Sequence, residues 1–130
     1  QDRITSKNIL VRKVYDKKDY RMKLNKSKMK IALANIIINA IESMTLDAGK
    51  LTLGVHSKNG KCLIQIEDNG CGINKVNLKN IFNPYYSNKA GGLGGLVSTY
   101  EILRKNHIKV NVESSLGKGT RFDLLFDEQI

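Results

Sequence analysis

The residues best suited to bind a ligand are at positions 68–72, where an acidic residue is followed by two glycines in the order Asp-Asn-Gly-Cys-Gly. Residues 62–67 alternate like a half-buried strand, and Asp68 continues their apolar face. A carboxylate on that face is costly unless hydrogen-bond donors meet it. Gly70 and Gly72 permit a tight turn and the close approach of a ligand. The pattern therefore predicts a pocket with an acidic anchor.

A polar stripe on a predicted helix offers a second set of candidate ligands. Asn35, Asn39 and Glu42 are spaced at i, i+4 and i+7, so they share one side of the helix. The other side is apolar and consists of Leu33, Ile37, Ala40, Ile41 and Met44. The stripe either lines a cleft or faces solvent, and its spacing alone leaves both open.

Two further segments can contribute to a site. Residues 91–95 (Gly-Gly-Leu-Gly-Gly) precede a helix and can present backbone N–H groups to phosphates, although flexible loops have the same composition. Thr120 begins a strand whose inward face continues with Phe122 and Leu124, so its hydroxyl points inward. It is either a ligand-binding residue or a buried β-branched residue bonded to the backbone.

Hairpins and helices must position these residues. We expect strands at residues 8–15, 20–24, 51–55, 62–68, 108–114 and 120–126, and helices at residues 28–46 and from Leu96 onward. Ser27 is the predicted N-cap of the first helix, and Asn59 with Gly60 predicts a hairpin turn. Residues 72–92 fit neither pattern and are expected to be irregular, as in a lid. The order indicates an α+β fold, a two-layer α/β sandwich with a mixed sheet and helices on one face.

Length and composition restrict the class of protein. The 130 residues suit a single domain over residues 1–130, and the missing initiator Met suggests a fragment of a longer protein. No apolar run approaches the roughly 20 residues of a membrane span, so we expect a cytoplasmic domain without membrane contact, whether or not its parent is anchored. The net charge is +10, but the lysines are scattered and not interleaved with aromatic residues, so no nucleic-acid partner is expected. Cys62 and Cys71 have no metal or redox spacing and are expected to be free thiols.

Taken together, these segments resemble the GHKL superfamily of gyrase, HSP90-type chaperones, MutL and histidine kinases. Residues 35–40 resemble its N box, residues 68–72 its G1 box, and residues 81–89 its F box. Residues 91–96 resemble its G2 box, and residues 117–122 its closing strand. The F box is typical of the catalytic ATP-binding (HATPase_c) domain of bacterial sensor histidine kinases. The resemblance implies a Bergerat-type fold with an ATP lid.

The resemblance also implies a nucleotide pocket that holds ATP or ADP. Asp68 would accept a hydrogen bond from the adenine amino group, a contact that distinguishes adenine from guanine. The other residues implied to line the adenine pocket are Gly70, Gly72, Ile73 and Thr120, the last of them through a water molecule. Asn39 would bind the Mg²⁺ that bridges the phosphates. The residues implied to bind phosphate or to form the lid are Phe82, Lys89, Gly91, Gly95 and Leu96.

Asn35 distinguishes the kinases from the hydrolases of this superfamily. The hydrolases have a water-activating Glu at this position, and an amide cannot serve as that base. Asn35 and Lys89 are therefore the expected catalytic residues of a phosphoryl transfer to a His. Neither His56 nor His107 lies on a helical hairpin, so we expect the acceptor in a His-bearing dimerisation domain elsewhere in the parent, with a response regulator downstream.

Two alternatives remain at this stage. One is an ATP-hydrolysing module of the MutL or gyrase type, which the basic composition supports. The other is a nucleotide-binding domain without kinase activity. It is favoured by residues 91–96, which read Gly-Gly-Leu-Gly-Gly-Leu where the family usually has Gly-x-Gly-Leu-Gly-Leu.

Overall fold

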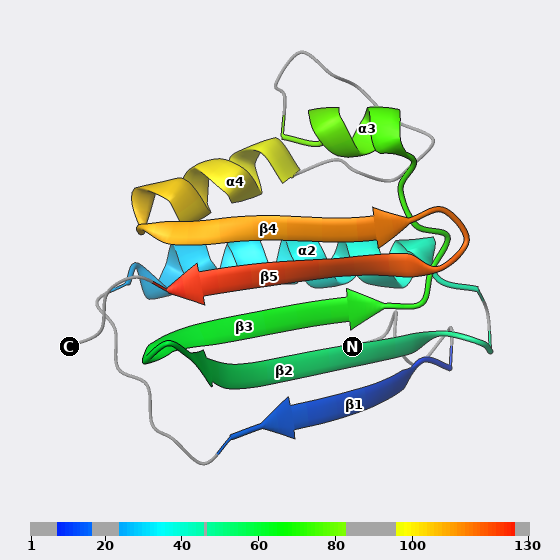
Figure 1. Ribbon diagram of the computed structural model, residues 1–130, viewed down its shortest axis with the longest axis horizontal. Coiled ribbons are helices and arrows are strands. Elements are labelled where there is room, and N and C mark those ends of the chain that lie inside the picture. The colour runs from blue at the N-terminus through cyan, green and yellow to red at the C-terminus, as the bar shows by residue number, and fades with distance from the viewer. Residues whose placement is uncertain (1–7, 17–23, 46, 83–95, 127–130) are drawn as a thin grey trace.

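A computed structural model describes residues 8–16, 24–45, 47–82 and 96–126 of the chain. Its strands are β1 (Leu10–Tyr15), β2 (Lys50–Lys58), β3 (Lys61–Asp68), β4 (Ile108–Ser115) and β5 (Gly119–Phe126). Its helices are α2 (Lys26–Ser43), α3 (Lys75–Asn80) and α4 (Leu96–Lys105). The strands form one sheet in the order β1-β2-β3-β5-β4 (Figure 1). β1 runs parallel to β2 and the other pairs are antiparallel, so the predicted mixed sheet is confirmed.

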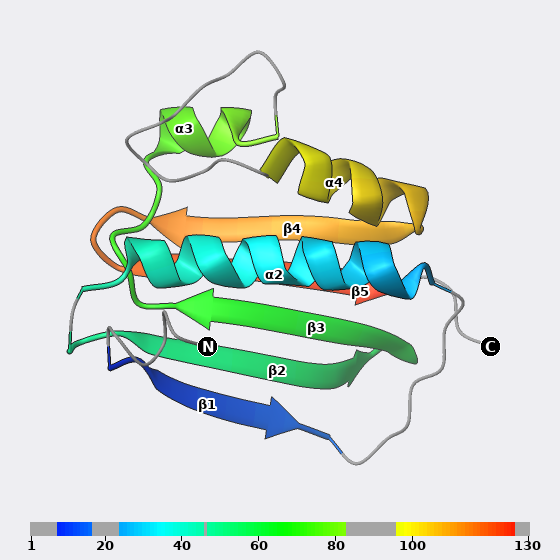
Figure 2. The same ribbon diagram turned by 180° about the vertical axis from the view of Figure 1, so that it is seen from behind.

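The helices form the second layer of the fold. Figure 2 shows α2 crossing one face of the sheet, with α4 and α3 along the side where β4 forms the edge. α2 packs against α4 and β3, and α4 packs against β4. Leu51, Ile66 and Leu124 are buried on the sheet side of this interface, and Ala32 and Ile36 on the helix side. The predicted α+β sandwich is therefore confirmed.

The buried face of α2 agrees with the predicted one at Ala40, Ile41 and Met44 and differs from it nearer the start of the helix. Ala32 and Ile36 are its most buried positions, whereas Leu33 and Ile37 are only half-buried against the core. The reason is α4, which covers one flank of α2 and so widens and rotates the buried face. The predicted cap is also wrong, because Asn25, and not Ser27, accepts the N–H of Lys28 at 3.1 Å.

The hairpin between β2 and β3 is confirmed and fixes the position of Asp68. Asn59 and Gly60 both have positive φ angles, 52° and 80°, as a two-residue type I′ turn requires. In the register that follows, Ile64 and Ile66 share the inner face with Asp68, and Thr120 of β5 pairs with Asp68 across the sheet. The hairpin and the β3–β5 pairing therefore deliver both polar side chains to the same end of the sheet.

Other sequence expectations fare differently. The segment predicted to be irregular contains the short helix α3, capped by Asn74, whose side chain accepts the N–H of Asn77 at 2.8 Å. A six-residue helix is too short to show a helical period in the sequence. The strand predicted at residues 20–24 lies outside the described residues except for Leu24, which is not in a strand. Residues 83–92 of the segment predicted to act as a lid also lie outside them.

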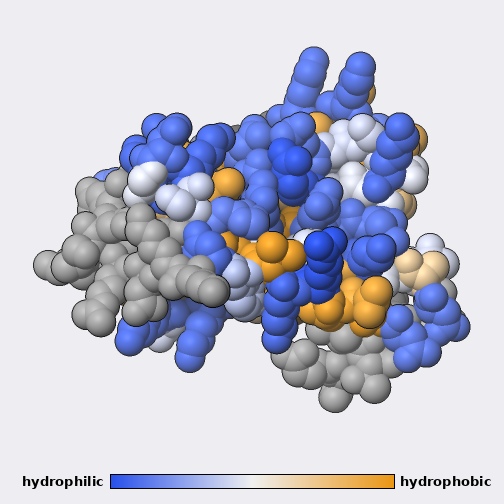
Figure 3. Space-filling model, turned by 60° about the horizontal axis from the view of Figure 1, so that its bottom comes forward, coloured by the Kyte–Doolittle hydropathy of each residue, from blue (hydrophilic) through white to orange (hydrophobic). Residues whose placement is uncertain are grey.

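The outer face of the sheet is polar and ion-paired. Arg121 bonds to Glu113 and, at 3.0 Å, to Asp123, which also accepts the side-chain N–H of Gln65. Figure 3 shows the side of the molecule on which the β1 edge lies; its visible surface is mostly hydrophilic, with a hydrophobic area near the centre. Among the described ranges, no helix combines the length and apolar character needed to cross a membrane.

Candidate functional site

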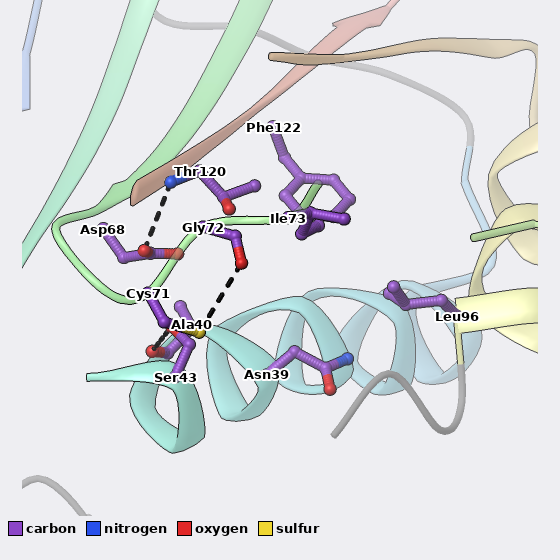
Figure 4. A pocket seen from close by; sticks show the side chains of 10 residues that line it. All are labelled: Asn39, Ala40, Ser43, Asp68, Cys71, Gly72, Ile73, Leu96, Thr120 and Phe122. Atoms are coloured by element: carbon purple, nitrogen blue, oxygen red, sulfur yellow. Dashed lines mark hydrogen bonds between the residues drawn. The ribbon is translucent and has the colours of Figure 1, made fainter. Parts of the chain in front are cut away.

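The end of β3 presents a buried carboxylate to a cavity between the sheet and α2. Asp68 is 7% exposed, and its Oδ1 atom accepts the backbone N–H of Gly70 at 2.8 Å and of Thr120 at 3.3 Å. Figure 4 shows the side chain between the start of β5 and the C-terminal turn of α2. Because both backbone donors bind Oδ1, a ligand would find its acceptor at Oδ2. The predicted acidic anchor thus has the hydrogen bonds that its burial requires.

Burial also sets the charge state of this carboxylate. Removal from water raises the pKa of Asp68 above its usual value of 3.8, and the neighbouring Glu67 adds slightly to the rise. The N–H groups of Gly70 and Thr120 act in the opposite direction, because they stabilise the ionised form, whereas the hydroxyl of Ser43 donates its hydrogen to the carbonyl of Ala40 at 2.7 Å. The net result is a carboxylate that takes up a proton more readily than an exposed Asp.

The loop after Asp68 is held between α2 and the turn that joins β4 to β5. Cys71 donates its backbone N–H to the carbonyl of Ser43 at 3.0 Å. A Cβ atom at Gly70 would overlap the Ser43 side chain, and one at Gly72 would overlap the carbonyl oxygen of Ser115. Gly72 also has a φ of 75°, which disfavours any other residue there. Both glycines are therefore required by the close approach of α2 and of the β4–β5 turn, and the predicted close approach of a ligand stays a prediction.

Ser114 joins the loop to β5 on the other side of the cavity. Its hydroxyl donates to the carbonyl of Gly119 at 2.8 Å and accepts the backbone N–H of Ile73 at 2.8 Å. It also lies 2.8 Å from the hydroxyl of Thr120. Since the single Ser114 hydrogen is used on Gly119, Thr120 is the donor in that pair. The lone pairs of Thr120 then remain available to a ligand or a water molecule.

The cavity brings together residues from four separate parts of the chain. It has about 360 Å³ of empty space, including the part open to solvent, and a water-sized sphere can move through about 30 Å³ of it. It is lined by Asn39, Ala40, Ser43, Asp68, Cys71, Gly72, Ile73, Leu96, Thr120 and Phe122 (Figure 4). The walls combine apolar side chains with a few polar groups, as in small-molecule sites generally. The enclosed part is narrow, so a planar ring would have to displace side chains at the mouth.

The two asparagines of the polar stripe have different surroundings. Asn39 lines the cavity and is half-buried. Asn35 donates its side-chain N–H to the hydroxyl of Thr99 on α4, at 3.1 Å, and is not among the lining residues. Glu42 is exposed. The cleft interpretation of the stripe therefore holds for Asn39, and the solvent interpretation holds for Glu42.

The remaining predicted site residues fall into three groups. Ile73 and Leu96 line the cavity, and Leu96 is fully buried at the start of α4. Phe82 does not line it and stacks on Tyr100 of α4, with ring centroids 4.6 Å apart. The predicted site residues outside the described part of the chain are Lys89, Gly91 and Gly95. The ligand-binding roles of all these residues stay predictions.

Sequence reasoning missed two serines that hold the site together. Ser43 lies one turn after Asn39 on α2, and that i+4 spacing was the only available signal. Ser114 gave no signal in the sequence, because only the folded structure brings it next to its partners Ile73, Gly119 and Thr120. Neither serine belongs to a recognisable sequence motif, and each has a role only because of the elements that pack against it.

The cysteines and possible metal ligands complete the description. Cys62 is buried and Cys71 is exposed, and both are free thiols, as predicted. Within the described ranges, no group of three or more His, Cys, Asp and Glu side chains could hold a metal ion. A metal bound there would depend on Asn39 and on oxygens of the ligand itself.

Comparison with known proteins gives a consistent result. A profile of the family described as "Histidine kinase-, DNA gyrase B-, and HSP90-like ATPase" matches residues 25–130. Sporulation kinase B of Bacillus subtilis (strain 168) is 33% identical over 95 residues, which are 72% of this chain and 22% of that protein. The signal transduction histidine-protein kinase AtoS of Escherichia coli (strain K12) is 35% identical over 99 residues, 75% of this chain and 16% of that protein. The chain thus spans less than a quarter of the length of these relatives.

Solved structures share the fold. The catalytic domain of histidine kinase ThkA, in a nucleotide-free form, superposes with a TM-score of 0.83 at 24% identity, covering 96% of this chain and 82% of that one. The mycobacterial sensor histidine kinase MprB gives a TM-score of 0.81 at 17% identity, with coverages of 96% and 85%. At these identities the likeness shows the fold alone, and the chemistry of the site has to be inferred from the residues of this chain.

Proposed function

Because this chain belongs to the family of histidine kinase-, DNA gyrase B- and HSP90-like ATPases, we propose that it binds Mg²⁺–ATP as the catalytic domain of a sensor histidine kinase. In this proposal the parent protein moves the γ-phosphoryl group to a His on a dimerisation domain outside residues 1–130. A response regulator then receives the phosphoryl group. The curated relatives named above, a sporulation kinase and a histidine-protein kinase, support the assignment.

The observation that carries the proposal is the buried carboxylate of Asp68. Its Oδ1 is occupied by two backbone donors, and the cavity in front of it has an apolar wall that includes Ile73 and Leu96. An apolar slot with a single acceptor at its end suits a flat ring that carries an amino group. Adenine has such a group, whereas guanine presents a carbonyl oxygen at the corresponding position and would face the carboxylate unfavourably.

The Mg²⁺ part of the proposal depends on Asn39. A neutral amide oxygen in the cavity fits this ion, which is usually held by one or two protein oxygens together with phosphates and water. Bound there, Mg²⁺ would neutralise charge on the phosphates. Asn39 lies one helical turn from Ser43, so the same face of α2 serves the metal and the pocket.

Transfer to another nucleophile is favoured over hydrolysis by position 35. A side-chain amide cannot act as a base at neutral pH, and the amide of Asn35 already donates a hydrogen bond to Thr99. In the transfer, the bond between the γ-phosphorus and the β,γ-bridging oxygen breaks, ADP leaves with the electron pair, and an imidazole nitrogen forms the new P–N bond. The imidazole releases its proton to solvent. The domain's part is to position the nucleotide and to stabilise its charge.

Calorimetric titration of the intact chain tests the nucleotide-binding claim. ADP and a non-hydrolysable ATP analogue are expected to bind with one-site stoichiometry, more tightly with Mg²⁺ than without it, whereas GDP is expected to bind much more weakly. Equal affinity for ADP and GDP would remove Asp68 from its proposed role. No binding of either adenine nucleotide would favour a domain disabled by its exchanged residues in positions 91–96.

The kinase claim needs a second assay. The chain is mixed with the dimerisation domain of its parent and radiolabelled ATP, and acid-labile, base-stable phosphate on that domain is the expected product. Nucleotide binding without phosphohistidine would indicate a non-catalytic module. Steady release of phosphate by the chain alone would indicate a hydrolase.

A further inference from the structure

A second hollow lies on the flank of α4 that faces away from α2, where the helix meets the first residues of β4. It is lined by Tyr100, Arg104, His107, Ile108, Lys109 and Val110, and a water-sized sphere can move through about 480 Å³ of it. The same measure gives about 30 Å³ for the cavity at Asp68. The hollow is therefore a surface groove with room for side chains of another molecule. We call it the α4–β4 groove.

The charge of the α4–β4 groove has one sign. Arg104 and Lys109 line it together with the imidazole of His107, and none of its lining residues is acidic. Glu101 pairs with Arg104 at 2.9 Å, but both side chains are about half exposed, so water weakens this pair. Lys105 next to Arg104 is exposed and adds a further positive charge. The groove therefore attracts anionic groups.

The floor of the α4–β4 groove is apolar and ordered. Ile108 is buried, Val110 is half-buried, and Tyr100 is held by its stack on Phe82. The turn into β4 is held as well. Asn106 caps α4 through the carbonyl of Ile102 at 2.8 Å. A preformed apolar floor with a basic rim suits a chain that carries one apolar side chain among acidic ones.

The position of the α4–β4 groove beside the edge strand β4 indicates what shape of molecule would fit in it. β4 is the last strand of the sheet and pairs with β5, and among the described residues its other side is bordered by α4 and α3 and not by a strand (Figure 2). A groove between a helix and an edge strand is long and narrow, so it suits an extended segment whose side chains can enter it. A folded globular surface or a flat bilayer would reach the floor of the groove less well than an extended segment.

From the shape of the groove, its apolar floor and its charge, we propose that the α4–β4 groove binds an extended acidic segment of a partner protein, with one apolar side chain seated over Ile108 and Val110. Thr99 bonds to Asn35 of α2, whereas Tyr100 and Arg104 face the groove from the other flank of α4. The cavity at Asp68 touches α4 only at its first residue, Leu96, whereas the groove is lined by Tyr100 and Arg104, one and two turns further along, so the segment does not compete for the cavity. The proposal stands independently of the nucleotide chemistry.

A fluorescein-labelled peptide, Glu-Asp-Glu-Phe-Glu-Asp-Glu, tests the proposal by fluorescence anisotropy with the nucleotide-free chain. Saturable binding is expected, and it should weaken by at least about tenfold in the Arg104→Gln/Lys109→Gln variant, because two close charge pairs are lost. The control variant Lys13→Gln/Lys58→Gln removes the same charge from exposed positions elsewhere and should change the affinity by less than about twofold. A peptide with Ala in place of Phe should also bind at least about tenfold more weakly, because its apolar anchor is missing.

Four outcomes would overturn the proposal. These are absence of saturable binding, equal weakening by the two variants, equal affinity for the Ala peptide, and tighter binding of a single-stranded oligonucleotide or of anionic phosphatidylserine vesicles than of the peptide. The second and third would indicate attraction by net charge alone, and the last a nucleic-acid or membrane surface. Circular dichroism of both variants verifies that each is folded. Because no nucleotide is present, failure here is distinct from failure to bind ADP.

Discussion

Substituting Asp68 by Asn tests the central feature of the site while leaving its shape intact. The amide oxygen of Asn can keep both backbone bonds, from Gly70 at 2.8 Å and from Thr120 at 3.3 Å. The amide nitrogen then takes the place of Oδ2 and turns an acceptor into a donor. A ligand amino group would meet another donor instead of its acceptor. Leaving one buried polar group unsatisfied costs about 1–3 kcal/mol, which corresponds to a roughly 5- to 150-fold weaker ADP complex.

Calorimetry with ADP and Mg²⁺ measures this change, and urea unfolding provides its control. The folded protein raises the pKa of Asp68, so the proton is bound more tightly in the folded state than in the unfolded state. The contribution of this group to stability is therefore largest at low pH and is lost as the pH rises through the folded pKa. Above the folded pKa the ionised carboxylate does not stabilise the fold, and there Asp68→Asn should leave the free energy of unfolding unchanged or higher.

The reasoning would be refuted by an Asp68→Asn variant that binds ADP as tightly as the wild type. Weaker binding together with a large loss of stability would also count against it, because the effect would then come from a disturbed loop. GDP supplies a further check. The wild type should prefer ADP, and the variant should lose most of that preference.

Further predictions concern the same cavity. The affinity for ADP should fall as the pH drops toward the pKa of Asp68, which burial raises above 3.8, and titrations of Asp68→Asn should show no such midpoint. Asn39→Ala should reduce the ratio of ADP affinities measured with and without Mg²⁺, and a preserved ratio would place the ion elsewhere. Gly72→Ala should destabilise the fold by more than Gly60→Ala in urea unfolding. An alanine in the left-handed backbone conformation costs about 1–2 kcal/mol at either position. Only at Gly72 does the added Cβ atom also overlap Ser115, so equal losses of stability would contradict that contact.

Local patterns in the sequence were sufficient for several parts of the fold. Strand alternation placed Asp68 and Thr120 inward, and both are 7% exposed. The residue pair Asn59 and Gly60 identified the hairpin, because both residues tolerate the positive φ angles of a type I′ turn, and the structure has such angles at both. These features depend on neighbours one to four residues away, and such short-range rules hold before any tertiary contact forms.

Predictions from local patterns were wrong where a tertiary contact decides between two options that are equally good locally. Asn25 and Ser27 are both good caps, and the choice of Asn25 coincides with a tertiary contact, because its backbone N–H reaches the side chain of Asn106 after α4 at 3.3 Å. The buried face of α2 was centred incorrectly for a related reason. A helical wheel assumes one packing surface, whereas α2 has both the sheet and α4 against it.

The sequence by itself determined the binding chemistry: an inward carboxylate, glycines that permit close approach, and asparagines on one helix face. Tertiary structure alone decided which groups act together. The β3–β5 register sets Asp68 beside Thr120, the carbonyl of Ser43 holds the loop after Asp68 to α2, and Ser114 ties β4 to that loop. The same packing assembles the basic α4–β4 groove. These relations join residues far apart in the chain, and their distances are fixed only when sheet and helices pack, because local backbone preferences carry no information about which elements become neighbours.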